Sequence, residues 1–165
     1  VRIVLPVRSA QLQITALLIT LATSTALAAA PSDKGTAALE ILLACKAGSD
    51  FTQAQAEKAL QAAGLTHLRG GMFEVQGDKV ALFGGTVDSA SVDIAPGGSK
   101  SLHVYLKDVA ATQVGRQLSV TTVNEDAETE APSYIRKVDA KHTLHVGAAD
   151  DYEGYSASVT CQIAG

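Results

Sequence analysis

The segment at residues 155–163 constrains the fold of this chain more than any other part of its sequence. Apolar and polar residues alternate through it without interruption. Its apolar positions are Tyr155, Ala157, Val159, Cys161 and Ile163. Because successive side chains of a strand point to opposite faces of the sheet, this alternation predicts a β-strand with one buried and one solvated face. We therefore expect Cys161 to point into the core.

The second cysteine, Cys45, lies in a segment with helical spacing. Ala38, Ile41, Leu42 and Cys45 recur at intervals of three and four residues, which predicts one apolar stripe along a helix over residues 34–47. Both cysteines are then expected to face the same core. In an exported chain such a pair is expected to form a disulfide, which here would join the helix to the inner face of the sheet.

The order of the remaining elements predicts the fold class. Thr52 and Gln55 have the spacing of a capping box and Gly64 is a typical helix stop, so a second helix is expected over residues 52–64. Short segments between glycine-bearing turns predict strands at 72–75, 80–83, 86–94, 102–106, 118–123, 134–138 and 142–146. The first two of these strands are expected to form a hairpin. The predicted fold is α+β, with two N-terminal helices packed on one face of an antiparallel β-sheet.

The first 28 residues have the three parts of a secretory signal peptide. Arg2 and Arg8 precede an apolar stretch at residues 14–22, and Ala26 and Ala28 supply the small side chains expected before a cleavage site. We therefore expect a signal peptide over residues 1–28 and a single disulfide-linked domain over residues 29–165. The expected location is periplasmic or secreted.

The leader has two other interpretations. The leader could remain as a membrane anchor, but its apolar core is shorter than the roughly 20 residues that span a bilayer. Residues 42–45 resemble a lipoprotein processing box, which would have to follow the apolar stretch directly. Charged residues at positions 33, 34 and 40 separate the two. Cleavage remains the favoured interpretation, without stable membrane insertion of the mature chain.

The charge of the chain bears on its partners. It carries 13 basic and 17 acidic residues, and loss of Arg2 and Arg8 with the signal peptide leaves 11 basic ones, a mature net charge of −6 with histidines neutral. An acidic domain without Trp and with few other aromatic residues is a poor match for nucleic acid or anionic lipid. The expected partner is a protein, and its complementary charge would be basic.

The residues that could carry chemistry do not form a recognisable catalytic or metal site. His142 and His145 have the spacing of a zinc pair only on a helix, and their surroundings alternate as a strand, where they would point to opposite faces. Solvated strand histidines are therefore expected. The acidic residues at 150–153 lack the ligand spacing of a calcium loop. The segments 154–158 and 97–101 fail the patterns of a serine elbow and a phosphate loop. We expect no cofactor, no metal and no enzyme activity.

Two features remain as a candidate binding surface. The segment at residues 124–132, between two predicted strands, carries the carboxylates Glu125, Asp126, Glu128 and Glu130. This segment is either a solvated loop or an acidic finger presented to a basic partner. His103 and Tyr105 share the outer face of their predicted strand and could form part of a polar binding surface.

These patterns favour a small exported, non-catalytic binding protein, such as an inhibitor or immunity protein against an envelope-acting enzyme. The alternative is a structural or assembly component of the bacterial envelope that pairs its sheet edge with a strand of a partner.

Overall fold

A computed structural model describes residues 35–123, 132–148 and 154–165 of the chain. Its helices are α1 (Ala37–Leu43), α2 (Gln53–Ala62) and α3 (Ala111–Leu118). Its strands are β1 (Leu65–His67), β2 (Met72–Val75), β3 (Ala81–Leu82), β4 (Gly85–Ile94), β5 (Lys100–Lys107), β6 (Thr122–Val123), β7 (Ser133–Lys137), β8 (His142–Ala148) and β9 (Ala157–Ile163).

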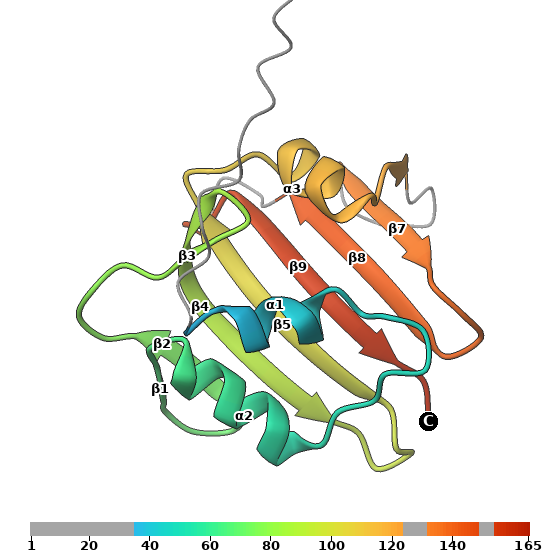
Figure 1. Ribbon diagram of the computed structural model, residues 1–165, viewed down its shortest axis with the longest axis horizontal. Helices are drawn as coiled ribbons and strands as arrows, with labels where there is room; N and C mark the ends of the chain where they lie inside the picture. Colours follow the sequence, from blue (N-terminus) through green and yellow to red (C-terminus); the bar gives the residue numbers. More distant parts are fainter. Residues whose placement is uncertain (1–34, 124–131, 149–153) are drawn as a thin grey trace, which may run out of the picture.

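The strands form one antiparallel sheet in the order β1-β2-β4-β5-β9-β8-β7-β6, with β3 paired to β4 (Figure 1). The C-terminal strand β9 therefore lies in the middle of the sheet, between β5 and β8. This position explains its strict alternation, because its inward side chains Ala157, Val159 and Cys161 are at most 1% exposed. The predicted half-buried strand is confirmed.

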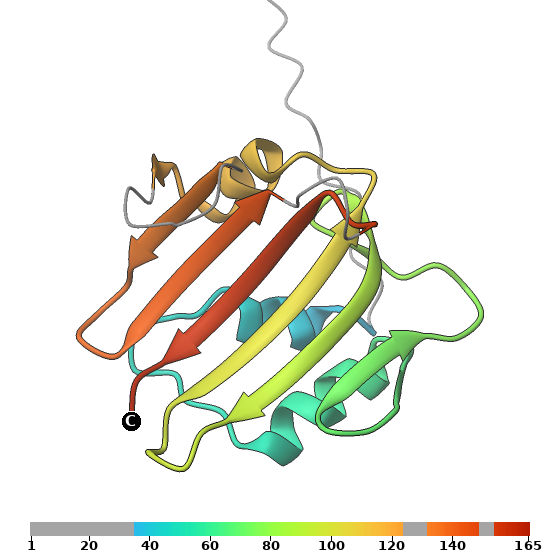
Figure 2. The ribbon, with the colours of Figure 1, turned by 180° about the vertical axis from the view of Figure 1, so that it is seen from behind.

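The helices cover one face of this sheet (Figure 1). Helix α1 packs against β9, α2 against β4, and α3 against β8 and β9. Beneath them lie the fully buried side chains of the central strands, among them Leu102, Val104, Leu106, Leu144 and Val146. Figure 2 shows the opposite side, where β4, β5, β9 and β8 run with no helix over them. We call this second side the open face.

Two local predictions are confirmed. Cys45 and Cys161 form a disulfide with Cα atoms 5.2 Å apart, which joins the segment after α1 to the central strand of the sheet. Helix α2 begins with the expected capping box: the Gln55 backbone N–H donates to the Thr52 hydroxyl at 3.2 Å, and the Thr52 N–H donates to Gln55 Oε1 at 2.8 Å. Gly64 follows the helix in the left-handed region, with φ +96°.

The predicted phase of the first helix is wrong. Leu39 and Leu43 are its buried residues, whereas Ile41 is 61% exposed. The helix ends at Leu43, and Cys45 has a left-handed backbone with φ 49°. Cys45 therefore reaches the core from a turn and does not continue the helical stripe. Of the helical residues in the predicted stripe, only the half-buried Leu42 packs against the core.

The fold class also needs a correction, because the helices are not all N-terminal. Helix α3 follows β5, and only Thr122–Val123 of the strand expected over residues 118–123 is extended. Gly115 lies inside α3, where a Cβ atom would approach the carbonyl oxygen of Val120 to 2.5 Å. A glycine inside a helix makes the free energy of helix formation about 1 kcal/mol less favourable than an alanine does. The residue that permits this close contact therefore weakens the helical signal in the sequence.

The predicted hairpin between residues 72–75 and 80–83 does not form. Strand β2 pairs with β1 and β4, and β3 pairs with β4 through Leu82 and Gly85. Phe83 and Gly84 form the connection, both with positive φ, as in the two-residue turns that match the twist of a hairpin.

In the described part of the chain no helix is long and apolar enough to cross a membrane.

Candidate functional site

The open face is built from side chains that alternate with the core residues of the central strands. Its middle row runs across the sheet from Ser91 through His103, Thr160 and His145 to Ile135, each paired with the next. The rows on either side carry Ser101, Gln162, Thr143, Ser89, Tyr105, Ser158, Gly147 and Ser133. The centre of this face therefore consists mainly of hydroxyl, amide and imidazole groups.

His103 and His145 lie on either side of Thr160 in this row. His103 Nδ1 is 2.8 Å from the Thr160 hydroxyl oxygen, and its Nε2 is 3.7 Å from Asp93 Oδ2. Burial lowers the pKa of His103, with Asp93 opposing the shift and His145 adding to it. Burial also lowers the pKa of His145, and a hydrogen bond with the Gln162 side chain opposes this shift. Both imidazoles are therefore mainly neutral at pH 7.

Tyr105 extends this surface with an aromatic pair. Its ring centroid lies 4.6 Å from that of Tyr155, with the ring planes inclined by 54°. The sequence placed Tyr155 on the inner face of the last strand, but β9 begins only at Ala157, so Tyr155 precedes the alternation and lies against the open-face residue Tyr105. His103 and Tyr105, two residues of the predicted binding surface, are thus brought together on one face, with the second tyrosine added.

Charged groups stand at the borders of the open face. Asp93 is at the end of β4, and Lys107 forms an ion pair with Asp88 at 2.5 Å at the other end of the β4–β5 pair. The hydrogen bond with Asp88 raises the pKa of Lys107. These charged groups therefore lie at the rim of the open face and not at its centre.

The acidic part of the predicted surface is not described by the structure. Glu125, Asp126, Glu128 and Glu130 fall within residues 124–131, outside the described ranges, as do the acidic residues at 150–153. The structure therefore does not relate these carboxylates to His103 and Tyr105.

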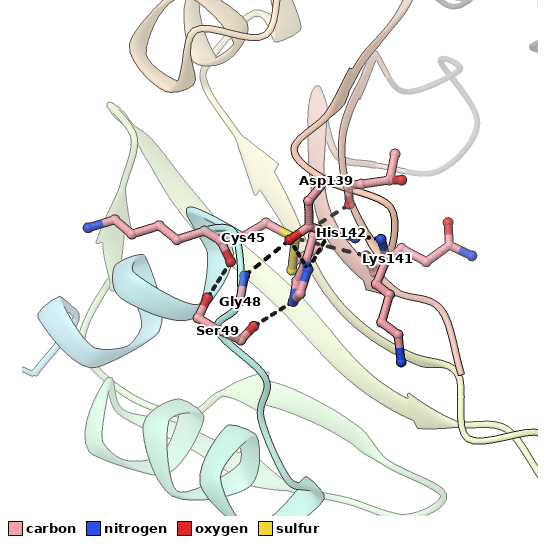
Figure 3. Close-up of polar contacts among 10 residues, drawn as sticks. Cys45, Gly48, Ser49, Asp139, Lys141 and His142 are labelled. Atoms are coloured by element: carbon pink, nitrogen blue, oxygen red, sulfur yellow. Dashed lines mark hydrogen bonds and ion pairs between the residues drawn. A yellow bond between two sulfur atoms is a disulfide. The ribbon is translucent and has the colours of Figure 1, made fainter.

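A second polar cluster lies on the helix-covered side, around His142 (Figure 3). His142 is only 4% exposed, so the prediction that it is a solvated strand histidine is wrong. Its Nδ1 lies 2.7 Å from Asp139 Oδ1, and its Nε2 lies 2.8 Å from the backbone carbonyl oxygen of Ser49. We call these three residues the His142 clamp. The signal for burial was present in the sequence, because His142 is in phase with Leu144 and Val146.

Asp139 is the most strongly bound carboxylate of the clamp. The backbone N–H groups of Lys141 and His142 each donate to its Oδ1 at 2.8 Å, and the Gly48 N–H donates to its Oδ2 at 3.1 Å. These contacts lower the pKa of Asp139 well below its ordinary value, with the hydrogen bond from the His142 ring as the largest cause. The carboxylate is therefore ionised throughout the neutral range.

The clamp combines the residue types of a Ser-His-Asp triad but lacks its geometry. In a triad the histidine nitrogen far from the aspartate takes the proton of the serine hydroxyl. Here that nitrogen contacts the carbonyl oxygen of Ser49, and the Ser49 hydroxyl donates instead to the Lys46 carbonyl at 2.6 Å. The arrangement therefore holds the backbone of residues 46–49 against the β7–β8 turn and does not activate a nucleophile.

A shallow depression of about 560 Å³ adjoins the clamp. Lys100, Lys141 and Asp50 are among its lining residues. Lys100 donates to Asp50 Oδ1 at 2.7 Å and to the Phe51 carbonyl at 3.0 Å, and this lysine lowers the pKa of Asp50. The charge of Lys100 is thus balanced by Asp50 within the protein.

The described residues offer neither a grouped set of metal ligands nor a free thiol. Among residues 35–123, 132–148 and 154–165, no three histidine, cysteine or acidic side chains are grouped so that they could hold a metal ion. Both cysteines are in the disulfide.

Comparisons of the chain with protein families, with curated proteins and with solved structures found no match. The geometry of the open face therefore carries the functional argument alone.

Proposed function

We propose that this chain is a small exported, non-catalytic protein that binds a protein partner through its open face. The observation that carries the proposal is the composition of that face: mainly uncharged polar side chains, with His103, His145 and the Tyr105–Tyr155 pair among them. Tyrosine is enriched among the residues that dominate binding energy at interfaces, because it offers a large contact area together with a hydroxyl group. Serine and threonine supply hydrogen-bonding groups around it.

The scaffold beneath this face favours recognition over catalysis. Strands β5, β9 and β8 hold the face from below with fully buried side chains, and the disulfide fixes the helical layer to the same β9. A rigid surface loses little conformational entropy when it binds. Such a scaffold suits an inhibitor or immunity protein against an envelope-acting enzyme, and the net charge of −6 expected after signal cleavage would favour a basic target.

The alternative role, assembly by strand addition, is less well supported. Strand addition needs a long free edge that offers unpaired backbone groups. In the described part of the chain the outermost strands are β1, with three residues, and β6, with two. Past the end of β6, the uncovered part of the β7 edge carries Arg136 and Lys137. Charged residues on a short edge oppose further pairing.

The proposal predicts that Tyr105→Ala weakens partner binding at least about tenfold, a loss of roughly 1.4 kcal/mol or more. The control is Ile41→Ala, which truncates an exposed apolar side chain on the solvent side of α1. Affinity for the partner isolated with the wild-type protein is measured for both variants by titration calorimetry. Equal affinity of Tyr105→Ala and wild type, or a loss confined to Ile41→Ala, would place the binding surface elsewhere.

A further inference from the structure

The strands of the open face are arranged symmetrically about β9. Strand β9 lies in the middle, with β5 and β8 on either side of it and β4 and β7 outside these (Figure 2). Residues paired directly across antiparallel strands share a face, so each row of the open face crosses these five strands. A two-fold axis parallel to β9 would lay the open face of a second copy on the first with every row over itself. In that arrangement β4 faces β7 and β5 faces β8.

One row of the open face carries opposite charges at its two ends. It begins at Asp93 on β4, crosses three uncharged residues of β5, β9 and β8, and ends at Lys137 on β7. The Asp93 side chain is 63% exposed, and Lys137 is exposed as well. When this row lies reversed over itself, the carboxylate of each copy faces the ammonium group of the other. Complementary charges of this kind fix the register of an interface.

The neighbouring rows are compatible with the same arrangement. Tyr105 on β5 and Gly147 on β8 lie on either side of β9 in one row, so the largest side chain of that row would face a position without a side chain. His103 and His145 have the same relation in the middle row and would face each other. Burial lowers the pKa of both imidazoles, which keeps them mainly neutral at pH 7. A neutral imidazole offers one donor and one acceptor, so this contact does not bring like charges together.

We propose that the open face pairs with the open face of a second copy of this chain, about a two-fold axis along β9, when no other partner occupies it. Face-to-face packing of two sheets with nearly aligned strands is a common arrangement, and a two-fold contact closes a dimer. Because the face is mainly polar, it lacks the apolar interface of obligate dimers, and the pairing is reversible. A partner that binds more tightly displaces the second copy. This competing role rests on the proposed function, whereas the pairing itself does not.

Sedimentation equilibrium of the mature protein, purified without any partner, measures the pairing over about 1 μM to 1 mM. We expect a reversible monomer–dimer equilibrium in the wild type. Asp93→Lys and Lys137→Glu each bring like charges together across the axis and should weaken dimerisation at least about tenfold. The variant with both substitutions exchanges the two charges, so its dissociation constant should return to within about threefold of the wild-type value.

The matched control is Lys58→Glu, which reverses the charge of an exposed lysine on α2, away from the open face. It should leave dimerisation unchanged. A wild-type protein that stays monomeric over the whole range would overturn the proposal. So would a dimer that neither single charge reversal weakens, or that the double substitution does not restore.

The pairing and the proposed function can fail separately. Sedimentation is measured without a partner, whereas the Tyr105→Ala experiment measures affinity for the partner. A monomeric wild type whose partner binding depends on Tyr105 would refute the self-pairing alone. A dimer with the expected response to charge reversal, together with partner binding that Tyr105→Ala leaves unchanged, would refute the proposed function alone.

Discussion

Replacing Cys45 and Cys161 together with alanine should lower the free energy of unfolding by up to about 4–5 kcal/mol, the value of the chain-entropy model for a long closed loop. The two residues are 116 positions apart, so the disulfide removes more freedom from the unfolded chain than a short loop would. Urea denaturation of wild type and the double variant measures the difference.

Reductant supplies the control for this experiment. It should destabilise the wild-type protein by a similar amount and leave the double alanine variant unchanged. A loss of less than about 1 kcal/mol would mean that strain or residual structure in the unfolded chain cancels the entropic gain, and that packing alone holds the helical layer on the sheet.

A large effect is also expected from Leu144→Ala, which should cost about 2–5 kcal/mol of unfolding free energy. Leu144 is fully buried beneath the helices, where it is paired with Cys161 across the sheet. Its neighbour Thr143 faces the open side, so Thr143→Ala should change stability by less than about 1 kcal/mol. Denaturant melts of the two variants therefore test which face of β8 is packed. A cost of several kcal/mol for Thr143→Ala would contradict an open face.

The sequence predicts best where one local rule decides the structure. The alternation over residues 155–163 identified a half-buried strand, and its position at the centre of the sheet accounts for the regularity of the pattern. The capping box at Thr52 and Gln55 depends on residues three positions apart and formed as expected. Cys45 and Cys161 were paired because the chain offers only two cysteines.

The wrong predictions for the first helix, α3 and β2 have a different cause. At these places tertiary contacts override the local sequence patterns. The stripe on the first helix included Cys45, which reaches the core from a left-handed turn outside the helix. Helix α3 contains Gly115, which the close approach of Val120 requires and which weakens the helical pattern. Strand β2 pairs with β4 and with β1, a three-residue strand that the sequence patterns did not predict.

The candidate site shows the same division. Alternation placed His103 and Tyr105 on one outer face, but it could not show that Thr160 and His145 lie beside them, because these come from β9 and β8. His142 was expected in solvent although its phase matched Leu144. Its burial depends on Ser49, 93 positions away, which supplies the acceptor that a buried imidazole needs.

Site-specific photo-crosslinking tests most directly whether the open face binds a partner. A benzophenone amino acid is placed at Gln162, an exposed residue of the open face, or at Gln61, an exposed residue of α2 on the other side of the protein. Both variants are expressed in the native cells and irradiated. We expect one discrete crosslinked protein from position 162 and none from position 61. Crosslinking from position 61 alone, or from neither position, would contradict the proposal that the open face is the binding surface.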